Sequence, residues 1–254
     1  MRTKFVAGNW KMNGNLASNQ ALLQTLIPGL SRVAGVKCTI CVAYPYLAQV
    51  QQLLSGASGV SWGAQDVSQF DAGAYTGEVS GAMLVDFGCR YVIVGHSERR
   101  NLFGETNEIV AQKYAAALKA GLTPILCVGE TLAEREAGST EATVGGQLAV
   151  VLERSGAQSF AHAVIAYEPV WAIGTGKTAL PEEAQAVHAY IRGRLSSQDA
   201  AVAAAVPVLY GGSVKGSNAA QLFAMPDIDG ALVGGAALDA GEFSTICQAA
   251  RPAG

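Results

Sequence analysis

The 254-residue sequence carries little charge, because only 15% of its residues are Asp, Glu, Lys or Arg, and its net charge is −3. It contains no run of lysine and arginine. Nucleic acids and anionic membrane surfaces bind through a concentrated positive field, so we expect neither as a partner. Half of the residues are hydrophobic, which excludes a disordered chain and provides for a large core.

The sequence also lacks a hydrophobic run of the roughly 18 residues that cross a bilayer, so no membrane segment is expected. Its first residues, MRTKFVAGNWK, lack the apolar centre of a signal peptide. The five cysteines are an odd number, which indicates free thiols in a reducing compartment. We therefore expect the protein to be cytoplasmic.

Two of the cysteines, Cys38 and Cys41, form a C-x-x-C pair within an apolar, β-branched run that is typical of a strand. Positions i and i+3 of a strand face opposite sides, so packed cysteines are favoured over a redox or metal pair. Elsewhere His, Cys and carboxylate residues do not cluster at metal-ligand spacing. The sequence therefore predicts no metal site.

Short apolar runs alternate with helical patterns along the whole chain. The eight runs are KFVAGNW, KCTICVAY, VSWGAQ, RYVIVGH, LTPILCVG, AVIAYEP, VPVLYGG and GALVGG. Apolar residues at helical spacing lie between them, as in 17–30, 105–118, 140–152 and 181–195. The runs recur about every 32 residues, the size of a βα unit, and no linker interrupts them. This pattern predicts one closed (β/α)8 barrel domain over residues 1–254, with an open doubly wound sheet as the weaker alternative.

Polar residues and glycines follow almost every run, and barrel enzymes place their chemistry at this carboxyl end of the strands. Glu168 follows the sixth run, where a general base would lie, although a solvated glutamate is the alternative. The residues after it include Trp171 and Ile173, which are typical of a lid that excludes water. The GTGKT motif within this loop is no P-loop, because a P-loop requires a first glycine at the position that Trp171 occupies.

Other strand ends carry further candidates. His96 precedes an expected helix whose positive end disfavours a charged imidazole, so a neutral donor is predicted. Asn9 and Lys11 share one face of the first strand end, where Lys11 is a candidate electrostatic clamp or Schiff-base amine. The glycines of 211–213 and 234–235 would expose N–H groups to a phosphate, with close packing as the alternative.

The segments GNWKMN, YVIVGHSERR, CVGE, AYEPVWAIGTGKTA and YGGSV occur in an order and spacing by which the sequence resembles the triosephosphate isomerase family. The resemblance covers nearly the whole chain, with one small departure at Ala237, where that family often has serine. It implies a cofactor-independent interconversion of dihydroxyacetone phosphate and D-glyceraldehyde 3-phosphate through an enediolate, in glycolysis and gluconeogenesis.

The resemblance also implies a role for each site residue. Glu168 would move a proton between C1 and C2, neutral His96 would polarise the carbonyl, and Lys11 with Asn9 would stabilise the negative charge. The residues implied to hold the phosphate are Gly174, Ser213, Gly234 and Gly235. Loop 169–179 would close as a lid, and the residues implied to support the site or the lid are Glu98, Cys127, Glu130, Trp171, Ile173 and Tyr210.

The segment Asp66–Gly81 after the third run is too long for a barrel loop, which typically has about 2–6 residues. It contains Phe70 and Tyr75, which would be costly to expose, and a self-packed Ω-loop is one explanation. The resemblance implies instead a homodimer, in which Tyr75 and Thr76 enter the neighbouring subunit and Thr76 reaches the Asn9 and Lys11 of that subunit.

Two other functions are consistent with such a barrel. A Schiff-base aldolase could use Lys11 or Lys177 with the same phosphate site. A catalytically inert barrel could bind a phosphorylated metabolite without converting it.

Overall fold

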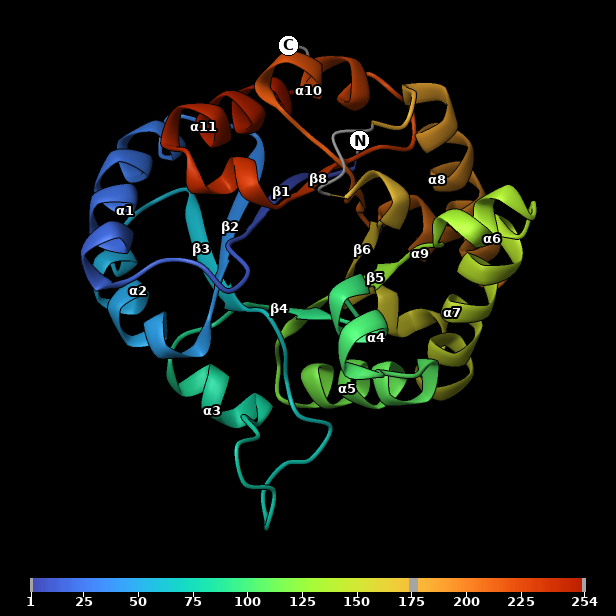
Figure 1. Cartoon of the computed structure of the whole chain (residues 1–254), viewed down its shortest axis with the longest axis horizontal. Coiled ribbons are helices and arrows are strands. Elements are labelled where there is room, and N and C mark those ends of the chain that lie inside the picture. The colour runs from blue at the N-terminus through green and yellow to red at the C-terminus, as the bar shows by residue number, and fades with distance from the viewer. Residues whose placement is uncertain (1, 174–177, 253–254) are drawn as a thin grey trace.

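The computed structural model describes residues 2–173 and 178–252, in which eight parallel strands form a closed barrel in chain order, with β8 next to β1. Figure 1 shows the strands around the centre and the helices around the outside. The predicted (β/α)8 barrel is confirmed, and the open sheet is excluded. The strands are β1 (Lys4–Asn9), β2 (Val36–Val42), β3 (Val60–Ala64), β4 (Tyr91–Val94), β5 (Thr123–Val128), β6 (Val164–Tyr167), β7 (Val208–Tyr210) and β8 (Gly230–Val233).

Helices cover the outer face of the barrel, and short extra helices stand at its rim. The α-helices of the described residues are α1 (Leu16–Leu30), α2 (Leu47–Leu54), α3 (Gly81–Asp86), α4 (Ser97–Phe103), α5 (Asn107–Lys119), α6 (Leu132–Glu136), α7 (Thr140–Ser155), α8 (Pro181–Ser196), α9 (Ala200–Ala205), α10 (Gly216–Phe223) and α11 (Ala240–Ala249). The short 3-10 helices are η1 (Tyr44–Tyr46), η2 (Ala157–His162), η3 (Val170–Ala172) and η4 (Gly235–Leu238). No helix within 2–173 or 178–252 is long and apolar enough to cross a membrane.

A side-chain cap moves one helix start from its predicted position. The helix predicted from Glu105 begins two residues later, at Asn107, because the Thr106 hydroxyl accepts a hydrogen bond from the Ile109 N–H at 3.3 Å. Glu105 is left outside the helix, where it pairs with the buried ammonium group of Lys113.

Two apolar layers enclose the strands, as expected for parallel strands that are buried on both faces. The residues packed inside the barrel are Phe5, Ala7, Cys41, Ile93, Ile125, Cys127, Val164, Ala166, Leu209 and Leu232. Alternate strand residues, among them Val6 and Cys38, belong to the layer between strands and helices. Cys38 and Cys41 therefore lie on opposite sides of β2, as predicted, and all five cysteines are buried and free.

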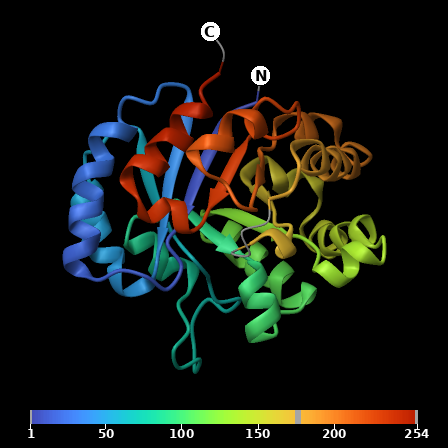
Figure 2. The same cartoon turned by 45° about the horizontal axis from the view of Figure 1, so that its top comes forward.

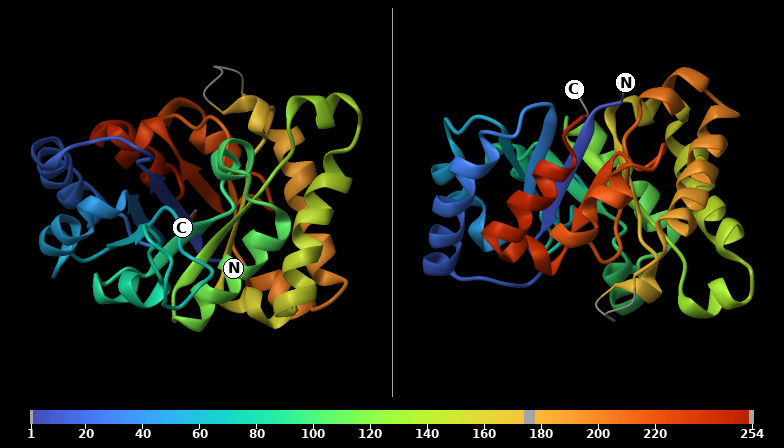
Figure 3. Two further views of the ribbon diagram at one scale, coloured as in Figure 1. Left: turned by 60° about the horizontal axis from the view of Figure 1, so that its bottom comes forward. Right: turned by 90° about the horizontal axis from the view of Figure 1, so that it is seen from above.

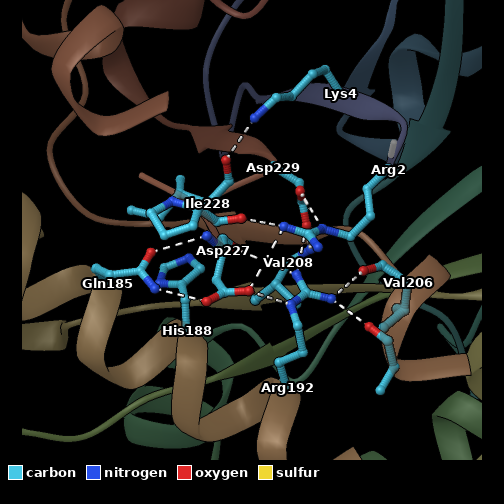
Figure 4. A network of polar contacts seen from close by, with 12 residues as sticks. Arg2, Lys4, Gln185, His188, Arg192, Val206, Val208, Asp227, Ile228 and Asp229 are labelled. Atoms are coloured by element: carbon cyan, nitrogen blue, oxygen red, sulfur yellow. Dashed lines mark hydrogen bonds and ion pairs between the residues drawn. The ribbon is translucent and has the colours of Figure 1, made fainter. Parts of the chain in front are cut away.

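An ion-pair network joins the first and last strands at their amino ends (Figure 4). Arg192 of α8 lies 2.7 Å from Asp227 and 2.8 Å from Asp229, and Arg2 lies 2.8 Å from Asp229. Gln185 of α8 donates to the Asp227 carboxylate at 2.7 Å and accepts from its N–H at 3.0 Å. Arg2 precedes β1 and Asp229 precedes β8. These contacts therefore stabilise the junction of β1 and β8, which closes the barrel, at the amino ends of the strands.

After β3 the chain leaves the barrel, and residues 65–80 form a loop without helix or strand that projects from its body (Figures 1 and 2). Its base is anchored, because Asp66 contacts Lys113 of α5 at 2.7 Å and Arg99 of α4 at 2.9 Å. The rings of Phe70 and Tyr75 stack with centroids 3.8 Å apart, yet the two residues stay 39% and 42% exposed. The loop thus packs on itself without covering its aromatic residues.

Candidate active site

A cavity of about 230 Å³ opens at the carboxyl ends of the strands. In the right-hand view of Figure 3, η3 lies at this end and the two ends of the chain lie at the other. The residues that line the cavity are Asn9, Lys11, His96, Glu168, Ile173, Gly211, Gly212, Ser213, Val214, Lys215, Leu232, Gly234, Gly235 and Ala236. The four residues predicted to act in catalysis therefore meet in one place, together with Ser213, Gly234 and Gly235 of the predicted phosphate site.

Glu168 follows β6 and is only 2% exposed. Its carboxylate accepts hydrogen bonds from the Ser97 N–H at 2.9 Å and the Ser97 hydroxyl at 3.2 Å, and it lies 3.0 Å from Nε2 of His96. Burial raises the pKa of Glu168, but the charge of His96 and these hydrogen bonds outweigh burial, so that the pKa lies below its ordinary value. The base is thus held as a carboxylate.

His96 caps the start of α4, where its Nδ1 accepts the Glu98 N–H at 3.2 Å. This bond places the proton of a neutral ring on Nε2, the atom that faces Glu168. Burial lowers the pKa of His96, but the charge of Glu168 and its hydrogen bond raise it by more. In this arrangement a carboxylate 3.0 Å from Nε2 opposes the effect of the helix end on His96, and the predicted neutral donor stays a prediction for the site with substrate bound.

Lys11 is, within the described chain, the one residue other than glycine with a positive φ, at +51°. Such a left-handed backbone costs free energy and persists only when its surroundings hold it. Asn9 Oδ1 accepts the Lys11 N–H at 3.0 Å, and Gln65 Nε2 donates to the Lys11 carbonyl at 2.9 Å. The ammonium group of Lys11 lies 2.5 Å from Glu98 Oε1, at the edge of the cavity.

Backbone groups that follow β7 and β8 line the same cavity. Ser213 follows β7, and Gly234 and Gly235 lie where β8 ends and η4 begins. Consecutive N–H groups at a turn or helix start favour an anion. Gly174, which was predicted to join them, lies outside the described residues.

The residues before the undescribed stretch 174–177 are held by Glu130. Its Oε1 accepts hydrogen bonds from Trp171 Nε1 at 3.0 Å and from the Tyr167 hydroxyl at 3.1 Å. The guanidinium of Arg135 lies over the Trp171 ring, 4.4 Å from its centroid. Ile173 lines the cavity, and Tyr210 is buried in the layer between the strands and the helices.

The remaining predicted residues lie as follows. Cys127 is buried beside Glu168, and burial with the charge of Glu168 raises the pKa of its thiol. Tyr75 and Thr76 are exposed on the projecting loop and do not line the cavity of their own chain. Among the described residues no group of three or more His, Cys, Asp or Glu side chains is arranged to hold a metal ion.

Sequence reasoning missed two residues that touch the site. Ser97 binds both oxygens of Glu168 through its backbone N–H and its hydroxyl. Gln65 donates to the carbonyls of Lys11 and Cys41, at 2.9 and 3.0 Å. Their partners are 71, 54 and 24 residues away in the chain, so no local pattern could indicate them.

Comparisons with known proteins agree with this geometry. The family model described as triosephosphate isomerase matches residues 4–250. The triosephosphate isomerase of Thiobacillus denitrificans is 64% identical over 250 residues, which cover 98% of this chain and 99% of that protein. Those of Herminiimonas arsenicoxydans and Nitrosomonas eutropha are 59% and 57% identical, and each match covers 98% of this chain and at least 99% of the relative.

Proposed function

The chain belongs to the triosephosphate isomerase family, and from this premise we propose how its side chains interconvert dihydroxyacetone phosphate and D-glyceraldehyde 3-phosphate in glycolysis and gluconeogenesis. The observation that carries the proposal is the approach of the Glu168 carboxylate to His96 Nε2, at 3.0 Å, beside Lys11 in one cavity. A base, a hydrogen-bond donor and a cation are the groups that an enediolate intermediate requires.

Glu168 is the base that removes a proton from C1 of the ketone and returns it to C2. Its lowered pKa keeps it ionised and able to accept that proton. To reach a substrate it must leave Ser97, and Gly211 leaves room for this movement, because a Cβ there would lie 2.8 Å from Glu168 Cγ. The move also removes the contact that raises the pKa of His96.

His96 then donates from Nε2 to the carbonyl oxygen and passes protons between the enediolate oxygens. Burial, which lowers its pKa, favours the neutral ring once Glu168 has moved away. The Lys11 ammonium and the Asn9 amide stabilise the negative charge that develops on these oxygens. The strained backbone of Lys11 supports this role, because strain of this kind is kept where a precise position is needed.

The phosphate is bound by the backbone of Ser213, Gly234 and Gly235, with Gly174 contributing from the lid. The lid, loop 169–179, closes over the substrate and excludes water. The contact of Trp171 with Glu130 at 3.0 Å supports an open position in the structure, and the hydroxyl of Tyr210 is the partner of the closed lid.

The active form is a homodimer in which loop 66–81 enters the neighbouring subunit. Support comes from apolar side chains that a single chain leaves exposed at this face: Met12 is 94% exposed, Leu102 74% and Phe103 69%. Thr76 of one subunit then supports Lys11 of the other. We place the enzyme in the cytoplasm, where its five free cysteines stay reduced.

A coupled isomerisation assay of the purified chain tests this function. We expect a measurable kcat in both directions that disappears in Glu168→Gln, whereas an inert binding barrel would show no turnover in either protein. Treatment with borohydride and substrate separates the isomerase from a Schiff-base aldolase. The isomerase stays active and unmodified, whereas an aldolase would be trapped covalently through Lys11 or Lys177.

A further inference from the structure

The residue that follows β5, Gly129, is held on both sides of its backbone by a single side chain. Its N–H donates to Gln147 Oε1 at 2.8 Å, and its carbonyl accepts from Gln147 Nε2 at 2.9 Å. Gln147 is buried on α7. One carboxamide thus satisfies both polar groups of a residue that lies at the end of a strand, in the way that a neighbouring strand would.

The backbone of Glu168 rests directly on this segment. The Glu168 N–H donates to the carbonyl of Val128 at 2.8 Å, and the Val170 N–H donates to the carbonyl of Glu130 at 3.1 Å. A side chain at Gly129 would overlap the Glu168 carbonyl. The backbone of residues 128–130 therefore determines the position of the Glu168 backbone and of the start of loop 169–179.

We propose that Gln147 is a positioning residue for the catalytic base: by holding Gly129 it sets where the backbone of Glu168 and the start of the lid lie. This inference rests on Glu168 being the base. Gln147 lies outside the substrate cavity and lines a separate polar cavity of about 160 Å³, which Glu168 also borders. Its hydrogen bonds to Gly129 connect it to the reaction through the backbone of residues 128–130.

The geometry makes the expected kinetic effect specific. Errors of about 1 Å in the position of a catalytic group cost roughly 10²-fold in rate. The phosphate site, at Ser213, Gly234 and Gly235, is built from other strands and does not contact Gln147. Loss of the carboxamide should consequently lower kcat and leave KM nearly unchanged, and a misplaced lid should release more enediolate to phosphate elimination, which yields methylglyoxal.

The chain offers a matched control at the other end of the barrel. Gln185 also forms a pair of hydrogen bonds from a helix to a loop, at 2.7 and 3.0 Å to Asp227 (Figure 4). Gln147→Met and Gln185→Met each remove one such pair. We expect both to lower the melting temperature, and only Gln147→Met to lower kcat, by about tenfold or more, and to raise the methylglyoxal fraction.

A kcat for Gln147→Met within twofold of wild type would overturn the proposal, as would an equal loss in Gln185→Met. The proposed isomerase function is tested separately, by turnover of the wild-type protein. A failure of the Gln147 proposal can therefore be told from a failure of the proposed function. Inorganic phosphate, used as a competitive inhibitor, should bind Gln147→Met as it binds the wild type.

If Gln147→Met does not fold, Gln147→Glu decides the question. The glutamate carboxylate can still accept a hydrogen bond from the Gly129 N–H. Its second oxygen, however, faces the Gly129 carbonyl, which is also an acceptor. Protonation of the carboxylate restores a donor to that carbonyl. We expect its kcat relative to wild type to recover as the pH is lowered. The charged groups that border the same cavity, Arg100, Glu134 and Glu168, are present in both proteins, so a ratio that does not change with pH would refute the proposal.

Discussion

Ser97 binds both oxygens of Glu168, with its backbone N–H donating to Oε2 at 2.9 Å and its hydroxyl to Oε1 at 3.2 Å. The base is therefore held against the start of α4 while it lines the cavity. This position also brings Glu168 within 3.0 Å of His96, so that the two main acid–base groups stabilise one another's charge before substrate arrives.

This pairing makes the stability contributed by His96 depend on pH. Its pKa is raised by folding, so its contribution is complete below the unfolded pKa of about 6.5 and is lost as the pH rises through the folded pKa. The lowered pKa of Glu168 acts in the opposite sense and loses its contribution only as the pH falls below about 4.5. The pair thus stabilises the fold most between these values.

We therefore expect His96→Gln to lose more unfolding free energy at pH 6 than at pH 9, by about 1.4 kcal/mol for each unit by which folding raises the pKa. Urea unfolding of both proteins at the two pH values measures the difference. A destabilisation that is the same at both would show that His96 is not paired with Glu168 in the free enzyme.

The strained backbone of Lys11 predicts that two substitutions of this residue reduce activity alike but differ in their effect on stability. Lys11→Gly and Lys11→Ala both remove the ammonium group, and both should abolish most turnover. Glycine adopts φ +51° without strain, so Lys11→Gly should be more stable than Lys11→Ala by roughly 1 kcal/mol. Equal melting temperatures for the two variants would indicate that the backbone at Lys11 is not strained.

The projecting loop predicts that activity depends on dimerisation. Replacing Tyr75 and Thr76 with glutamate should give monomers by sedimentation, with a strongly reduced kcat, because Lys11 loses its support from the neighbouring subunit. Replacing the exposed Ala201 and Ala204 of α9 with glutamate adds the same charge elsewhere and should leave the dimer and its kcat intact. A wild-type chain that is monomeric and fully active at nanomolar concentration would contradict the proposal.

The barrel and the placement of Glu168, His96, Asn9 and Lys11 could be predicted because both depend on local pattern. Apolar runs repeat at the length of a βα unit, and the polar residues that end these runs must meet at one rim. The role of Ser97 and the contacts of Gln65 could not be predicted, because their partners are remote in sequence and include backbone carbonyls, which leave no trace in a local pattern. The raised pKa of His96 in the free enzyme has a similar cause, since the carboxylate that raises it belongs to Glu168, which follows β6.

The central claim is that Glu168 is the base, and the kcat of Glu168→Asp in a coupled isomerisation assay tests it most directly. The substitution withdraws the carboxylate by one methylene, so the fold should be retained while kcat falls by roughly 10²-fold. KM should change little, because the phosphate site is built from Ser213, Gly234 and Gly235. A kcat close to that of the wild type, in a variant with an unchanged melting temperature, would contradict the account.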